Sequence, residues 1–240
     1  MTGRTGRRGW FIRLLIGGVV LAAIGLVGVP FIYTRFINDP APRLTFENFD
    51  AQTTSTEVPV VVASEVDSDL SGTWVVAPGS EVGYRVPEVI SGQSTEGVGR
   101  SKTVEGSVTV ADGRLTSAEF SVDVASLKSD SARRDAQFAG RIMNAEEFPV
   151  ASFTSTSTPE VALPTDGSPT SVTVDGQLAL HGAESTVSVP VELRMVDGSV
   201  QMQGSITVKF ADFGIDDPSV GPVKTGDTGL IEFLLTMKRS

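Results

Sequence analysis

The chain has 240 residues and 40% hydrophobic content, so it can bury a core, and one domain is expected beyond its N-terminal segment. It has no cysteine and one histidine, which excludes disulfides and cysteine metal sites and argues against a histidine metal cluster or catalytic relay. The net charge is −10; residues 1–35 carry five arginines and no acid, so the remainder carries −15, and nucleic-acid binding is not expected.

The first predicted element is a membrane helix over residues 14–35, preceded by a basic segment, residues 1–13. The stretch from Leu14 to Tyr33 is uncharged, and about 20 helical residues span a bilayer core of roughly 30 Å. Four arginines before it predict a cytoplasmic N-terminus and a domain held outside the cell membrane. A cleaved signal peptide is the alternative, but the apolar run is longer than a usual signal peptide core, and a core helix would lack helical partners.

Residues 36–71 have the composition of a tether. They contain three prolines, the patch "QTTSTE" and the acidic run "SEVDSDLSG". Such a composition is typical of a spacer that lifts a domain off the membrane. The domain itself is then expected over residues 72–240.

Apolar and polar residues alternate along most of this domain. In "VSVPVELRMVDGSVQMQGSITVKF", residues 187–210, nearly every second residue is apolar on both sides of an Asp-Gly pair. The same period of two recurs in "SEVGYRV", "SAEFSVDVASL", "SVTVDGQLAL" and "LIEFLLTMK". This pattern indicates antiparallel strands with one apolar face and one polar face.

Turn signals at residues 111–113, 165–167, 181–182 and 197–198 separate these strands into hairpins. The predicted fold class is therefore all-β, with about eight antiparallel strands. The apolar faces can be hidden in a closed barrel or in a two-sheet sandwich, and the sequential hairpins favour the barrel. A barrel of this size either fills with its own side chains or holds one small ligand.

The segment Ser129–Pro149 lacks this alternation and predicts one or two short helices across one end of the sheet. Asp130 is the expected N-cap, and Pro149 ends the segment. Its larger apolar side chains are expected to point into the barrel as a plug: Phe138, Ile142, Met143 and Phe148.

Five segments in order resemble the YceI-like family of bacterial polyisoprenoid-binding proteins, over nearly all of Gly72 to Ser240. They are "GTWVVAPGSEVGYRV", "VEGSVTVADGRLTSAEFSVDVASLKSD", "RRDAQFAGRIMNAEEFPVASF", "VDGQLALHGAESTVSVPV" and "ADFGI". With its anchor and tether, the chain resembles the form found in actinobacterial envelopes. Many members have a histidine after the Arg-Asp pair; this chain has Gln137 and Phe138 there, so a head-group role of that histidine does not carry over.

The resemblance implies a lipocalin-like barrel that holds a long isoprenoid chain, of a quinone or a polyprenyl carrier lipid, for transport, storage or presentation. Such a tail binds by removal of apolar surface from water, so no catalytic residue, metal or cofactor is expected. The candidate ligand-binding residues are Tyr84, Val86, Phe120, Val122, Phe138, Ile142, Phe148, Phe153, Leu178, Leu180, Val189, Val191, Met202, Ile206, Phe210 and Phe233.

Two other functions stay open. A barrel with a solid core would serve as a structural or partner-binding domain. An enzyme acting on an isoprenoid lipid would need a buried acid or base on the inward face, where the alternation shows only neutral residues, so an enzyme is not expected. Arg133, Arg134 and Asp135 fit either a diphosphate head group or a helix-surface ion pair, and the ion pair is favoured. The formation of homo-oligomers stays open.

Overall fold

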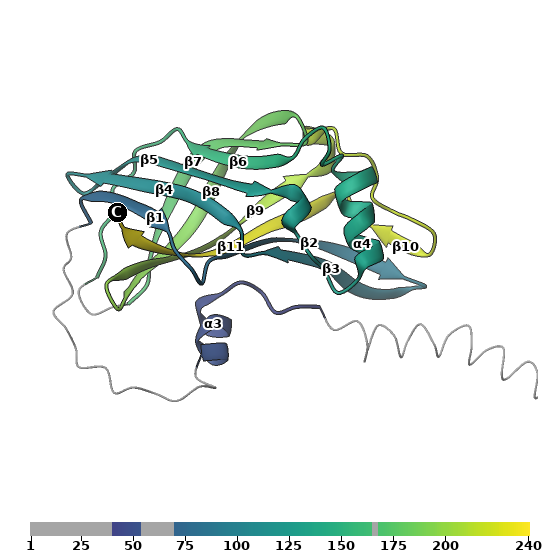
Figure 1. Ribbon diagram of the computed structural model, residues 1–240, viewed down its shortest axis with the longest axis horizontal. Coiled ribbons are helices and arrows are strands. Elements are labelled where there is room, and N and C mark those ends of the chain that lie inside the picture. Colours follow the sequence, from purple (N-terminus) through teal and green to yellow (C-terminus); the bar gives the residue numbers. More distant parts are fainter. Residues whose placement is uncertain (1–39, 54–69, 165–167) are drawn as a thin grey trace, which may run out of the picture.

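An antiparallel β-barrel forms the centre of the computed structural model, which describes residues 40–53, 70–164 and 168–240 (Figure 1). The predicted basic segment, residues 1–13, and the predicted membrane helix, residues 14–35, lie outside the described residues. Among the residues that are described, no helix is both long enough and apolar enough to cross a membrane.

Eight strands close the barrel, and each pairs with its neighbours in antiparallel register. Their order around the barrel is β1 (Gly72–Val76), β4 (Val104–Ala111), β5 (Arg114–Asp123), β6 (Val150–Ser155), β7 (Thr170–Leu180), β8 (Ala183–Val196), β9 (Ser199–Lys209) and β11 (Thr228–Arg239), which returns to β1. The predicted barrel of about eight strands is thus confirmed.

Three further strands extend this frame, because β2 pairs with β11 while β3 and β10 pair with β2. Their bounds are β2 (Glu81–Ile90), β3 (Gln93–Ser101) and β10 (Val223–Thr225). Two short 3-10 turns follow β5 and β9, namely η3 (Val124–Ser126) and η5 (Phe210–Phe213).

Strand β11 has two partners along one edge. Its residues Leu230–Leu234 pair with β2 and Met237–Arg239 pair with β1, so these two consecutive strands share the edge. Ser80 lies at the break between them. Its buried hydroxyl donates to the Ala77 carbonyl at 2.8 Å and accepts from the Thr236 backbone N–H at 3.0 Å. The sheet therefore stays hydrogen-bonded where the strand is interrupted.

The three predicted hairpin turns that fall within the described residues join β4 to β5, β7 to β8 and β8 to β9. In each turn both central residues have positive φ, as at Asp197 (49°) and Gly198 (71°). This backbone conformation is that of a type I′ turn, whose twist matches that of the flanking strands. The fourth predicted turn, residues 165–167, lies outside the described residues.

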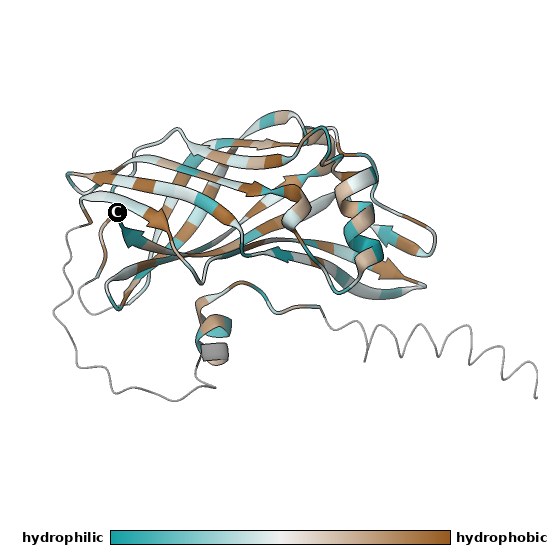
Figure 2. Cartoon of the chain, in the orientation of Figure 1, coloured by the Kyte–Doolittle hydropathy of each residue, from teal (hydrophilic) through white to brown (hydrophobic). Residues whose placement is uncertain are grey.

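The alternation of the sequence becomes a difference between the two faces of each strand, which Figure 2 shows as alternating brown and teal bands. On β7, Val174 and Leu178 are buried, while Thr173 and Gln177 are exposed. The inward-facing apolar side chains that are buried on all eight barrel strands belong to one cluster. The core is therefore the inside of the barrel, as a closed antiparallel sheet requires.

The segment between β5 and β6 forms α4 (Ala132–Gln137) and a π-helical turn, η4 (Phe138–Ile142), at one end of the barrel (Figure 1). The predicted N-cap at Asp130 is wrong by one residue. The cap is Ser131, whose hydroxyl accepts a hydrogen bond from the Arg134 backbone N–H at 3.5 Å. Asp130 instead forms an ion pair with the guanidinium of Arg134, four residues further along the chain.

Residues 40–53, which we call the strap, pack on the outer face of the barrel and end in α3 (Phe46–Thr53). Phe46 is buried, and the guanidinium of Arg194 lies 4.3 Å above the centre of its ring. This part of the tether predicted over residues 36–71 is thus attached to the barrel instead of extending away from it.

Candidate functional site

The barrel encloses an apolar cavity of about 530 Å³, a volume within the range of small-molecule sites. The cavity runs the length of the barrel. Its lining extends from Trp74 and Leu115, near the β4–β5 turn, to Val223 of β10 and Val220 beside it. All eight barrel strands contribute side chains, and most of these are aliphatic or aromatic. The interior can therefore shelter an elongated apolar molecule.

The structure places every predicted lining residue in the cavity wall except Phe148. Phe138 and Ile142 reach the cavity from η4, Phe210 reaches it from η5, and the others reach it from strands. The prediction for Phe148 is wrong: its ring packs on the β7–β8 turn, at 5.1 Å from the His181 ring and against Gly182, which has no side chain to obstruct it. Contact of the other residues with a ligand stays a prediction.

Four inward aromatic rings lie over glycines of the neighbouring strand. The pairs are Tyr84 over Gly99, Phe120 over Gly106, Phe153 over Gly176 and Phe233 over Gly204, and in each the ring would come within 3.0 Å of a β-carbon added to the glycine. A ring that rests on bare backbone stays against the wall. This arrangement explains why the aromatic residues line the cavity without filling its centre.

We expect Gly99→Ala to displace the Tyr84 ring from the wall. Three atoms of Tyr84 lie within 3.0 Å of the position of the new β-carbon, and such overpacking costs about 1–3 kcal/mol of unfolding free energy. Urea denaturation would measure the loss. The same substitution in a Tyr84→Ala background should be nearly neutral, because the clash is gone. A full loss in that background would show that the backbone, and not the ring, requires the glycine.

The α4–η4 segment covers the β10 end of the cavity. The Phe138 ring stacks on Tyr84 of β2 at 4.3 Å between centroids and 18° between planes. Arg141 donates to the Asp217 and Pro218 carbonyls at 3.2 and 2.7 Å. The segment thus links β2 to the loop that precedes β10. Burial raises the pKa of the Tyr84 hydroxyl, so the ring presents a neutral phenol to the cavity.

One acid lies in the cavity wall, which corrects the expectation of only neutral inward residues. Glu88 follows Tyr84 and Val86 in the inward alternation of β2, and its side chain is 10% exposed. The alternation contained this signal, since Glu88 is four residues after Tyr84 in a strand of period two. Burial raises the pKa of Glu88, although the nearby Arg134 charge opposes the rise.

We expect Glu88→Gln to stabilise the protein near neutral pH. A carboxyl whose pKa is raised on folding binds a proton more tightly in the folded state, so its stability contribution falls as the pH rises from 4.5 through the folded pKa. The variant has no carboxyl at this position, so its free energy of unfolding should exceed that of the wild type near neutral pH and equal it only in acid. Urea denaturation at about pH 4 and about pH 7 would test this. Glu184→Gln on the exposed face of β8 is the control. A variant less stable than the wild type at neutral pH would contradict the prediction.

The charged residues of α4 differ in their roles. Arg134 lies 3.5 Å from Glu88 and also pairs with Asp130, which supports the predicted ion pair. Asp135 accepts hydrogen bonds from the backbone N–H and the hydroxyl of Ser129, which precedes the helix. Arg133 is exposed at the edge of the cavity, where a head-group role stays a prediction. Across residues 40–53, 70–164 and 168–240, no three acidic or histidine side chains are grouped as a metal site.

Comparison with known proteins agrees with this architecture. A model of the YceI-like domain matches residues 74–237. A solved polyisoprenoid binding domain from Saccharophagus degradans is 16% identical, with a TM-score of 0.55 over 71% of this chain and 99% of that one. Burkholderia cenocepacia BcnA is 25% identical, with a TM-score of 0.51 over 67% of this chain and 98% of that one. No curated protein matches the chain.

Proposed function

Because the chain belongs to the family defined by the YceI-like domain, we propose that its barrel binds a long-chain isoprenoid lipid for transport, storage or presentation. The observation that carries this proposal is the apolar cavity of about 530 Å³ along the barrel. The Saccharophagus degradans domain of the same fold is described as polyisoprenoid binding, which supports the choice of an isoprenoid. The cavity argues against a barrel packed solid.

The energetics suit a ligand with little polar character. Burying a methylene group contributes about 0.8 kcal/mol, so each five-carbon unit contributes roughly 3–4 kcal/mol. A few units therefore exceed an association cost on the order of 4–15 kcal/mol. The proposal assigns no catalytic step to the cavity, where Glu88 is paired with Arg134. A quinone and a polyprenyl carrier lipid both fit this chemistry.

We further propose that the protein is anchored in the cell membrane through residues 14–35, with the barrel on the extracytoplasmic side. The support is in the sequence: an uncharged stretch of membrane-spanning length after four arginines. The envelope-anchored form and any homo-oligomer stay predictions. An alkaline phosphatase fusion at the C-terminus would be active if the barrel is outside the cytoplasm and inactive if it is inside.

Native mass spectrometry of the purified protein, followed by organic extraction, tests the lipid proposal. We expect a co-purifying species whose extracted mass fits a repeating five-carbon unit. A clean mass of the bare chain, in preparations that also fail to take up an added long-chain prenyl alcohol, would contradict lipid binding. Chemical turnover of the added prenyl lipid would instead indicate an enzyme.

A further inference from the structure

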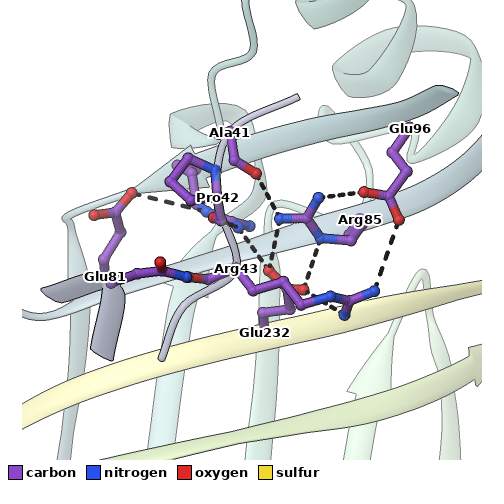
Figure 3. A network of polar contacts seen from close by, with 9 residues as sticks. Ala41, Pro42, Arg43, Glu81, Arg85, Glu96 and Glu232 are labelled. Carbon is purple, nitrogen blue, oxygen red and sulfur yellow. Dashed lines mark hydrogen bonds and ion pairs between the residues drawn. The ribbon is translucent and has the colours of Figure 1, made fainter. Parts of the chain in front are cut away.

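The strap covers charged residues that face outward from the barrel (Figure 3). Arg85 on β2 and Glu232 on β11 are 2% and 3% exposed, although they alternate with residues that line the cavity. Arg85 Nε donates to Glu232 at 2.7 Å, and Arg100 Nη2 on β3 donates to the same carboxylate at 2.6 Å. Charged side chains on the outer face of a barrel are this deeply buried only where another segment of the chain covers them.

The backbone at the start of the strap supplies that cover. The Ala41 carbonyl accepts from Arg85 Nη2 at 2.7 Å, and the Pro42 carbonyl accepts from Arg100 Nη2 at 3.2 Å. Arg43 donates to the carboxylate that the two arginines share, at 3.2 Å. These bonds fix the strap to three strands at its N-terminal end, because guanidinium donors buried without acceptors are costly.

The strap runs away from the β10 end of the barrel. Ala41 is bound to Arg85 of β2, and Arg85 pairs with Leu230 near the start of β11. The Phe46 backbone N–H donates to the side chain of Gln203 on β9, the residue that pairs with Leu234 of β11. Asp50 pairs at 2.6 Å with Arg194 of β8, which lies further from β10. The N-terminal end of the strap therefore lies toward β10.

The chain between the predicted membrane helix and this attachment is short. From residue 35 to Ala41 it spans at most about 20 Å, whereas a free tether of residues 36–71 would have an end-to-end distance of roughly 35 Å and could stretch much further. We propose that the strap holds the β10 end of the barrel at the membrane surface, so that this end of the cavity faces lipid. This inference rests on the proposed membrane anchor.

The β10 end has the chemistry that a lipid surface favours. Val89 of β2 is 41% exposed and lies opposite Lys224 of β10. Val220, 37% exposed, is bridged to Val223, and both also line the cavity. Exposed apolar side chains are thus continuous with the cavity interior. A lysine beside them is suited to anionic head groups.

Fluorescence quenching in vesicles tests the orientation. The chain has no cysteine, so Val220→Cys and Val75→Cys each give one labelling site, and these valines are 37% and 38% exposed. Val220 is bridged to Val223 of β10 and Val75 lies on β1, and these two strands lie at opposite ends of the barrel (Figure 1). The full chain would be labelled with an environment-sensitive fluorophore and reconstituted in phosphatidylethanolamine–phosphatidylglycerol vesicles that contain a doxyl-labelled lipid. We expect quenching at position 220 and none at position 75.

Two changes should abolish this difference without altering the barrel. One is a flexible Gly/Ser insertion of about twenty residues after Asp39, which lengthens the connection and leaves the strap in place. The other is Arg43→Ala combined with Phe46→Ala, which removes the guanidinium and the buried ring of the strap and so weakens its attachment; circular dichroism and retained lipid would verify the fold of the barrel. Loss of the quenching at position 220 in both supports the proposal, and its persistence in either overturns it.

The two proposals fail in different ways. If the chain floats with the vesicles but both positions are quenched equally, the orientation is wrong and the anchor stands. If the chain does not float with the vesicles, the anchor is wrong and the orientation falls with it. Extraction of lipid from the same samples reports on the cavity in either case.

Discussion

Replacing Glu232 by alanine is expected to lower the free energy of unfolding by about 3–5 kcal/mol, because it leaves two buried guanidinium groups without their shared counter-charge. Glu232 is 3% exposed and lies 2.7 Å from Arg85 Nε and 2.6 Å from Arg100 Nη2. The loss should appear as a lower urea midpoint with an unchanged slope. Glu81→Ala is the matched control. Glu81 lies 3.9 Å from Arg100 with its side chain 29% exposed, so its loss should stay below about 1 kcal/mol.

The pH dependence gives a second test of the same carboxylate. Burial alone would raise the pKa of Glu232, but the hydrogen bond from Arg85 and the charges of both arginines outweigh it and hold the pKa below 4.5. A depressed pKa contributes stability above pH 4.5 that is lost as the pH falls through the folded pKa. The wild type should lose more stability in this acidic window than Glu232→Ala does. Equal losses, or a Glu232→Ala variant as stable as the control, would show that the cluster is not coupled to folding.

The barrel could be predicted from the sequence because its determinants are local. A strand such as β7 carries its own period of two, and a pair such as Asp197-Gly198 specifies the tight turn that joins two strands. The inward set follows directly from that alternation, including Glu88, which continues the run of Tyr84 and Val86 on β2. Phe148 could not be placed this way, because it lies in an irregular turn without a period.

The attachment of the strap could not be predicted, because its determinants are distant in sequence. Arg43 and Glu232 are 189 residues apart, and each has the polar character expected of an exposed position. Proline-rich composition correctly describes a segment without a regular strand, but it does not reveal that the carbonyls of Ala41 and Pro42 accept from buried arginines. The local signal is the set of large apolar residues in this polar segment, Leu44, Phe46 and Phe49, of which Phe46 is buried.

Filling the cavity with Val174→Trp is expected to reduce lipid binding by about a hundredfold, since displacing one five-carbon unit removes roughly 3 kcal/mol of the binding free energy. Val174 is 7% exposed and lines the cavity midway along β7. The indole can occupy space that the ligand would use, so the free energy of unfolding without lipid should change by no more than about 1–3 kcal/mol. Uptake of a labelled long-chain prenyl alcohol would measure binding, and urea denaturation of lipid-free protein would measure stability.

Thr173→Trp provides the control for this substitution. Thr173 precedes Val174 on the same strand, has nearly the same shape as valine and faces solvent. The indole then lies outside the barrel, so uptake of the prenyl alcohol should equal that of the wild type. Because the two variants differ only in the face of β7 that carries the indole, reduced uptake in Val174→Trp alone places the lipid inside the barrel. Equal uptake by a folded Val174→Trp variant would instead place the bound lipid on the outer surface, and the cavity would lose its proposed role.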